Sequence, residues 1–165
     1  MGGRHGRSRS HRGQTLIEFA LVAPLALFFL LAIVDFGIAI DRRVVLQHAV
    51  REGARYAAVG GDALTSGTPA SVPEIRQHTA NQSQGIANGT ATSGNNYIEV
   101  CYENSNSNGT LGDAGDNVRV RIHYEYNFVT GLTSWIAPSL TSIVMKPDAN
   151  ARVEQAQTTG ATACG

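Results

Sequence analysis

The feature that most constrains this chain is an apolar run that begins shortly after a basic N-terminus. Residues 19–34, FALVAPLALFFLLAIV, are sixteen consecutive residues without a charge. As an α-helix this run would be roughly 24 Å long, and with its flanks, residues 16–40, it can cross the ~30 Å hydrocarbon layer of a bilayer. We therefore expect a transmembrane helix over residues 14–40, with the lipid bilayer as a partner.

The distribution of charge sets the direction of this helix. The formal net charge is zero, yet no acidic residue precedes Glu18. Four arginines lie in the first thirteen residues, namely Arg4, Arg7, Arg9 and Arg12. By the positive-inside rule the N-terminus is cytoplasmic and the chain after residue 40 is extracytoplasmic. We expect a single-pass cell membrane protein in which residues 1–13 form a disordered basic leader.

The charge of the remaining chain argues against a nucleic-acid partner. Four of the 13 Lys and Arg residues lie in the leader, which leaves nine against all 13 Asp and Glu residues. Binding to phosphates requires a clustered basic surface. We therefore assign the leader arginines to targeting and expect no binding of nucleic acid.

A cleavable secretory signal is the competing interpretation of the apolar run. Such a signal has a shorter apolar region and ends in small residues of the A-x-A kind. Residues 36–43, FGIAIDRR, offer no such site, and the helical pattern continues beyond them. The pattern favours a retained anchor.

Residues 41–61 continue the helix outside the membrane. An apolar seam recurs at spacings of three and four residues, through Leu46, Val50, Gly53 and Ala57. A polar face carries Gln47, Arg51 and Arg55. The glycine pair at 60–61 is expected to end the helix. The seam is suited to covering the domain of its own chain or to contacting another subunit, and the sequence leaves both open.

Residues 62–165 are predicted to form a small α+β extracytoplasmic domain. A capping box at Ser71 and Glu74 opens a short helix toward Ala87. Residues 97–103 and 117–128 alternate between apolar and polar side chains and predict an antiparallel pair. A third strand falls at 142–145 or at 149–155. We expect a three- or four-stranded antiparallel sheet packed on the long helix.

No catalytic, metal or cofactor motif is present. The five histidines show no metal-binding spacing, and the sequence lacks a P-loop, a GxSxG motif and a GxGxxG motif. We expect the domain carboxylates to be scattered over the solvent-facing surface rather than to form an acid and base pair; they include Glu99, Glu103, Asp116 and Glu125. The chain is therefore predicted not to be an enzyme and to bind no cofactor or metal.

The two cysteines, Cys101 and Cys164, both follow the predicted anchor. An oxidising compartment permits them to pair, and closing so long a loop stabilises a fold by roughly 4 kcal/mol in the chain-entropy model. Two unpaired thiols are the alternative; we favour the disulfide.

Two Asn-Gly-Thr sequences, at 88–90 and 108–110, match glycosylation acceptors but are more simply turns.

The junction RGQTLIEF, followed by the apolar run, resembles the cleavage region of type IV prepilin-like proteins. In these proteins a prepilin peptidase cuts after glycine on the cytoplasmic side, and a glutamate is fifth in the mature chain. Gly13 then precedes the cut, Gln14 becomes the new N-terminus, and Glu18 is the fifth residue, followed by Phe19. Within this superfamily, residues 12–61 are similar to TadE-like pseudopilins of tight-adherence pilus systems.

This resemblance implies a non-enzymatic minor pilin or pseudopilin that acts in pilus assembly, adhesion or secretion. Its implied partners are prepilin peptidase, other pilins or pseudopilins, and the pilus assembly machinery. Cleavage creates an α-amino cation at Gln14, one helical turn from Glu18, where the two charges can pair within a chain or between neighbours. Glu18 and Phe19 are thus the expected assembly residues. The alternative is a glutamate that reaches the membrane surface without a partner.

Two further functions remain open at this stage. An unprocessed, signal-anchored domain could bind a ligand or a wall component with its loops, and an anchored hydrolase could carry a site that no motif reveals.

The apolar run also contains Pro24, which removes one helical hydrogen bond. Asp35 follows the run, and we expect it to be exposed at the membrane interface rather than in contact with another helix.

Overall fold

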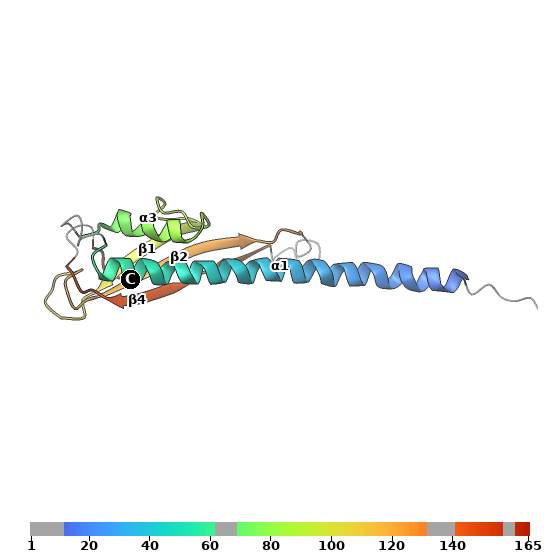
Figure 1. The fold of residues 1–165 in the computed structure, drawn as a ribbon, viewed down its shortest axis with the longest axis horizontal. Coiled ribbons are helices and arrows are strands. Elements are labelled where there is room, and N and C mark those ends of the chain that lie inside the picture. The colour runs from blue at the N-terminus through green and yellow to red at the C-terminus, as the bar shows by residue number, and fades with distance from the viewer. Residues whose placement is uncertain (1–11, 62–68, 132–140, 157–160) are drawn as a thin grey trace, which may run out of the picture.

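The computed structural model describes residues 12–61, 69–131, 141–156 and 161–165. One long helix, α1 (Arg12–Ala58), extends over most of the length of the molecule. A short helix and the sheet gather beside its C-terminal part (Figure 1). These elements are α3 (Val72–Gln82), β1 (Asn96–Glu103), β2 (Asn117–Asn127), β3 (Ser142–Met145) and β4 (Asp148–Arg152). The predicted α+β class, with a long helix and an antiparallel sheet, is confirmed.

Helix α1 is one unbroken element of 47 residues that runs through Pro24. It begins at Arg12, two residues before the predicted start at residue 14. Its end is as predicted. Gly60 and Gly61 adopt φ angles of 76° and 65°, and the Gly61 N–H donates to the carbonyl of Tyr56 at 2.7 Å.

The central pair of strands, β1 and β2, is antiparallel and places the predicted apolar residues opposite one another. The register pairs Ile98 with Ile122 and Val100 with Val120. All four side chains are at most 1% exposed. The opposite face of β2 carries half-buried Arg119 and Arg121, so the expected division into a buried and a wetter face is confirmed.

The third position in the sheet is occupied by two strands in succession. β3 pairs with the C-terminal half of β2, and β4 pairs with its N-terminal half. Between them the Ile122 N–H donates to the carbonyl of Pro147 at 3.0 Å. Both candidate segments are therefore strands, and together they form one interrupted edge. Pro147 lacks an N–H and marks the interruption.

The apolar seam of α1 covers the chain's own sheet and α3. Leu46, Val50 and Ala57 are fully buried, and Gly53 is buried with them. Arg51 and Arg55 lie on the exposed face of the helix. Of the two uses that the sequence left open, the structure thus shows the intramolecular one, and the seam is not available to another subunit.

Helix α3 opens with the predicted capping box. The Ser71 N–H and hydroxyl donate to Glu74 Oε2 at 2.6 and 2.9 Å, and these bonds, the backbone one first, lower the pKa of Glu74. The helix ends at Gln82, five residues before the predicted Ala87. The reason is local, since Gln84 and Gly85 adopt φ angles of 55° and 79° that a right-handed helix cannot contain.

The contact between α1 and α3 depends on the missing side chain of Gly53. A Cβ at this position would overlap the hydroxyl of Thr79, which is fully buried in α3. We expect Gly53→Ala to lower the free energy of unfolding by about 1–3 kcal/mol, the usual cost of overpacking a core. The measurement is denaturant unfolding of the full chain in detergent micelles.

Two variants control this prediction. In Gly37→Ala, on the same helix, the added methyl group meets no atom within 4 Å, so we expect an unchanged or slightly higher stability. In the double variant Gly53→Ala/Thr79→Ala the hydroxyl is removed, and most of the lost stability should return. A Gly53→Ala variant as stable as Gly37→Ala would contradict the packing argument.

Candidate assembly site

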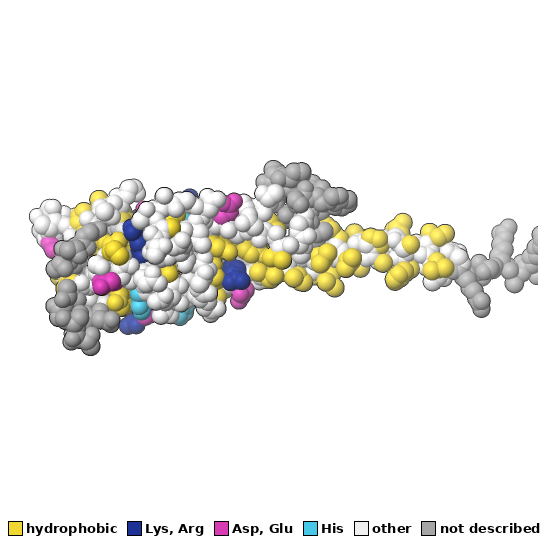
Figure 2. Space-filling model, turned by 90° about the horizontal axis from the view of Figure 1, so that it is seen from above, with side chains coloured by type: hydrophobic (Ala, Val, Ile, Leu, Met, Phe, Trp, Pro, Cys, Tyr) yellow, Lys and Arg dark blue, Asp and Glu magenta, His cyan; other side chains and the backbone are white. Residues whose placement is uncertain are grey.

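The N-terminal part of α1, residues 13–34, forms an apolar stem that the described domain leaves uncovered. Its most apolar 18-residue window has a mean hydropathy of 2.6 and no buried residue. Figure 2 shows the stem as a largely apolar surface, with the charged side chains of this face on the domain. The large exposed side chains include Leu16, Ile17, Phe19, Leu21, Val22, Leu25, Leu27, Phe29, Leu30 and Ile33.

The predicted processing and assembly residues lie together at the free end of this stem. Gly13 and Gln14 belong to the first turn of α1, and Glu18 follows one turn later. The Gln14 side-chain amide donates to Glu18 Oε1 at 3.3 Å. Phe19 is 70% exposed. The peptide bond between Gly13 and Gln14 is thus in the part of a helix that frays most readily, where backbone N–H groups lack intrahelical partners.

This geometry determines what the end of the stem can do chemically. If the chain began at Gln14, its α-amino group would lie four residues from the Glu18 carboxylate, within the reach of an i, i+4 pair. The carboxylate could instead accept the amine of a neighbouring helix laid beside it. If lipid surrounds the stem, either ion pair would form where water is scarce, and its geometry would matter more than at an exposed surface.

Asp35 occupies a different position from the one predicted. Its side chain is 3% exposed, and Oδ1 accepts hydrogen bonds from the N–H groups of Val129 and Thr130 at 3.1 and 3.2 Å. The Thr130 hydroxyl donates to the second carboxylate oxygen. The expectation of interfacial exposure was wrong because the partner is a loop some 95 residues away in sequence.

Tyr126 adds a second link between the sheet and this part of α1. Its hydroxyl, on β2, donates to the Asp35 carbonyl at 3.5 Å. Burial, and then the negative charge of Asp35, raises the pKa of Tyr126, which keeps this hydroxyl protonated as a donor. The folded domain therefore reaches back along α1 as far as residue 35.

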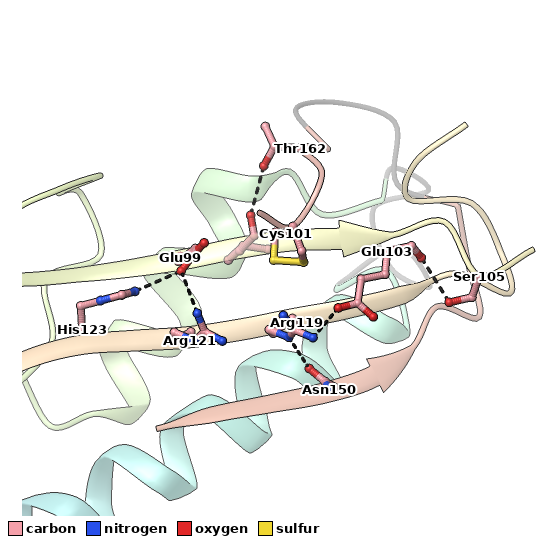
Figure 3. The surroundings of a disulfide bond; sticks show 11 residues. Glu99, Cys101, Glu103, Ser105, Arg119, Arg121, His123, Asn150 and Thr162 are labelled. Atoms are coloured by element: carbon pink, nitrogen blue, oxygen red, sulfur yellow. Dashed lines mark hydrogen bonds and ion pairs between the residues drawn. A yellow bond between two sulfur atoms is a disulfide. The ribbon is translucent and has the colours of Figure 1, made fainter. Parts of the chain in front are cut away.

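The structure contains a disulfide between Cys101, on β1, and Cys164, in the C-terminal tail, with Cα atoms 4.9 Å apart. The tail lies along the outer edge of β1, where the Tyr102 N–H donates to the Thr162 carbonyl at 2.8 Å and the Cys164 N–H donates to the Tyr102 carbonyl at 3.2 Å. The Thr162 hydroxyl donates to the carbonyl of Val100 (Figure 3). Part of an otherwise open sheet edge is thereby covered.

Ion pairs line the face of the sheet beside the disulfide (Figure 3). Glu99 lies 3.0 Å from His123 and 3.8 Å from Arg121, and Arg119 pairs with Glu103. These partly exposed pairs each contribute little to stability. Among the described residues, no group of three or more His, Cys, Asp and Glu side chains could hold a metal ion.

One of the predicted surface carboxylates is buried. Asp116 is 0% exposed, and its two oxygens accept hydrogen bonds from the N–H groups of Ser105 and Gly112, each at 3.0 Å. Asp116 therefore organises the loop between β1 and β2.

The two Asn-Gly-Thr sequences form turns as expected: the side chains of Asn88 and Asn108 each accept the N–H of the threonine two residues later at 2.9 Å.

Comparison with known families gives a match to helix α1 and not to the sheet. Residues 13–55 match the family model of TadE-like proteins. The predicted resemblance is confirmed over these residues, which are 43 of the 165 in the chain. Among the residues that the structure describes, one helix, at the N-terminal end, is long and apolar enough to cross a membrane, which fits a single-pass membrane protein. No curated protein and no solved structure matches the chain.

The extent of the TadE-like match is informative. It begins at Gly13, the predicted residue before the cut, and ends at Arg55, close to the end of α1. The matched part thus contains the stem, Glu18 and all of the seam except Ala57. The sheet, α3 and the disulfide lie outside it. Sequence reasoning missed one residue of this part, Asp35, whose only signal was a charge at the end of an apolar run.

Proposed function

We propose that this TadE-like chain is a minor pseudopilin that prepilin peptidase matures by cleavage between Gly13 and Gln14. The protein acts without enzymatic activity in the assembly of a tight-adherence pilus, and through the pilus it acts in adhesion or secretion. The observation that carries the proposal is the exposed apolar stem, which ends in Gly13, Gln14 and Glu18 where the TadE-like match begins. A helix of this kind can be held by lipid or by neighbouring helices of similar character.

The orientation follows from charge. The leader carries four arginines and no acid, so the stem inserts with residues 1–13 in the cytoplasm and the domain outside. This side of the membrane also permits the disulfide between Cys101 and Cys164, because extracytoplasmic compartments are oxidising. The peptidase then meets the junction at the cytoplasmic end of the stem.

The N-terminus of the mature protein tests this proposal. The full chain is co-expressed with its cognate prepilin peptidase, and the N-terminal peptide is identified by mass spectrometry. We expect the chain to begin at Gln14, with the loss of residues 1–13. A catalytically inactive peptidase serves as the control and should leave the leader attached. A membrane-inserted chain that keeps residues 1–13 beside an active peptidase would instead be an unprocessed anchored domain, and the proposal would fail.

A further inference from the structure

The contacts of Asp35 determine how close the folded domain would lie to a membrane that the stem crosses. If the stem crosses the bilayer from Gln14 to Val34, these residues span about 31 Å at 1.5 Å per residue, which matches the ~30 Å hydrocarbon layer. The outer boundary then lies near residue 35, where Val129 and Thr130 bind the Asp35 carboxylate. With this placement, the outer boundary would lie five residues before residue 40, which is the boundary expected from sequence.

Apolar side chains surround α1 at this level. Val129 is 70% exposed, Val144 is 59% exposed and Ile143 is 40% exposed. On α1 itself Phe36 and Ile40 are 63% and 50% exposed. We refer to these five residues as the rim. An apolar cluster of this kind is unusual on a surface that faces only water, and it adjoins the stem that enters the membrane.

A groove between α1 and β3 extends from the rim. It has a volume of about 420 Å³. Its apolar wall includes Phe36, Ile40, Ile143 and Val144, and its charged lining residues are Arg43, Lys146 and Asp148. Two cations and one anion therefore line the groove. Of the neighbouring charges, Asp41 and Arg42 offset one another, and the Asp35 carboxylate is bound by backbone N–H groups.

We propose that the rim lies in the headgroup layer of the outward-facing leaflet and that Arg43 and Lys146 bind the phosphate of an anionic phospholipid there. This inference rests on the proposed membrane insertion of the stem. Exposed apolar side chains flanked by basic ones are the pattern that binds a membrane surface, because the first enter the acyl boundary and the second attract anionic headgroups. Continuity with the stem favours lipid over a second protein as the occupant.

The depth of the rim is measured on the full chain in phospholipid vesicles, with the native disulfide left intact. Single cysteines replace Phe29 in the stem, Val144 in the rim and Arg51 on the exposed face of α1, and each carries a fluorescent label. We expect lipids brominated deep in the acyl chain to quench the Phe29 label, and lipids brominated near the headgroup to quench the Val144 label. Aqueous iodide should quench only the Arg51 label.

Each other outcome overturns the inference in a distinguishable way. A Val144 label quenched by iodide, beside a Phe29 label quenched by deep bromines, shows that the stem is inserted while the rim is in water. A Val144 label that neither quencher reaches shows that protein, such as a second copy of the chain, covers the rim. If iodide quenches the Phe29 label, the stem is not inserted in the membrane, and the proposed function fails together with the inference.

The lipid preference is tested by placing the bromines on phosphatidylglycerol or on phosphatidylcholine. In the otherwise native chain we expect stronger quenching of the Val144 label by the anionic lipid. Arg43→Gln and Lys146→Gln should each reduce this preference by about fivefold, whereas the matched variant Arg51→Gln should not change it. Equal quenching by the two lipids in the native chain would rule out the anionic site.

Discussion

Glu18→Gln is expected to be cleaved normally but to enter pilus assemblies about tenfold less efficiently than the native chain, a loss of about 1.4 kcal/mol. The substitution keeps the size of the side chain and its ability to accept the Gln14 amide, which lies 3.3 Å from Glu18 Oε1. It removes only the charge. A carboxylate costs roughly 2.5 to 3.5 kcal/mol at the bilayer centre and less near the surface, so pairing with an α-amino cation recovers free energy that a neutral amide cannot.

Two measurements are needed to read this variant. Mass spectrometry of the N-terminus shows whether cleavage at Gln14 is preserved, and cross-linking to the pilins, together with a count of surface pili, reports assembly. Leu21→Met is the matched control, because it lies on the same exposed stem and keeps the apolar contact area nearly constant without altering charge. Normal assembly by a cleaved Glu18→Gln chain would eliminate the ion pair as an assembly device and leave Glu18 as an acid that reaches the membrane surface.

Gly13→Ala is expected to reduce the rate of cleavage by about tenfold or more, which corresponds to at least ~1.4 kcal/mol in the barrier. Two effects act in the same direction. A Cβ next to the scissile bond restricts the close approach of a backbone to the peptidase, which glycine permits. Alanine also stabilises the first turn of α1 by about 1 kcal/mol relative to glycine, and that turn must open before the bond can be reached.

The surroundings of Gly13 in the structure allow the effect of Gly13→Ala on cleavage to be measured without a steric clash in α1. In α1 the added methyl group of Gly13→Ala would meet no atom within 4 Å, so the fold and the stem should be unaffected. Gly37→Ala, which is equally unobstructed on the same helix, should be cleaved at the native rate. The assay follows the shift in mass of the full chain over time with purified peptidase in micelles. Equal rates for both variants would show that Gly13 does not form the cut site.

The sequence was most informative where one periodicity dominates. The helix could be predicted from its apolar run and its end from the glycine pair. The alternation in β1 and β2 predicted which residues are buried. These signals are local, since each depends on side chains a few residues apart. The packing of the sheet on α1 was predicted from the need of the sheet to cover its apolar face, but the double occupancy of the third strand position could not be decided in this way.

The two misplaced acids show the limit of local patterns. Asp35 and Asp116 were both expected at a surface because isolated carboxylates usually are. Each is buried, and each is bound by backbone N–H groups of a loop. For Asp35 these donors are Val129 and Thr130, which follow β2 and lie some 95 residues later in the sequence. Such a contact depends on tertiary structure, and a single sequence contains no period that reports it.

Because α1 passes from the stem into the domain without a break, the described residues form no hinge between the two. A pull along the axis that lifts the stem by one helical turn would raise the domain by the same ~5.4 Å. A twist of the stem would turn the sheet by an equal angle. Force applied to the stem by an assembly machine would thus reach the domain directly, and the height of the domain above the bilayer would record how far the stem has been withdrawn.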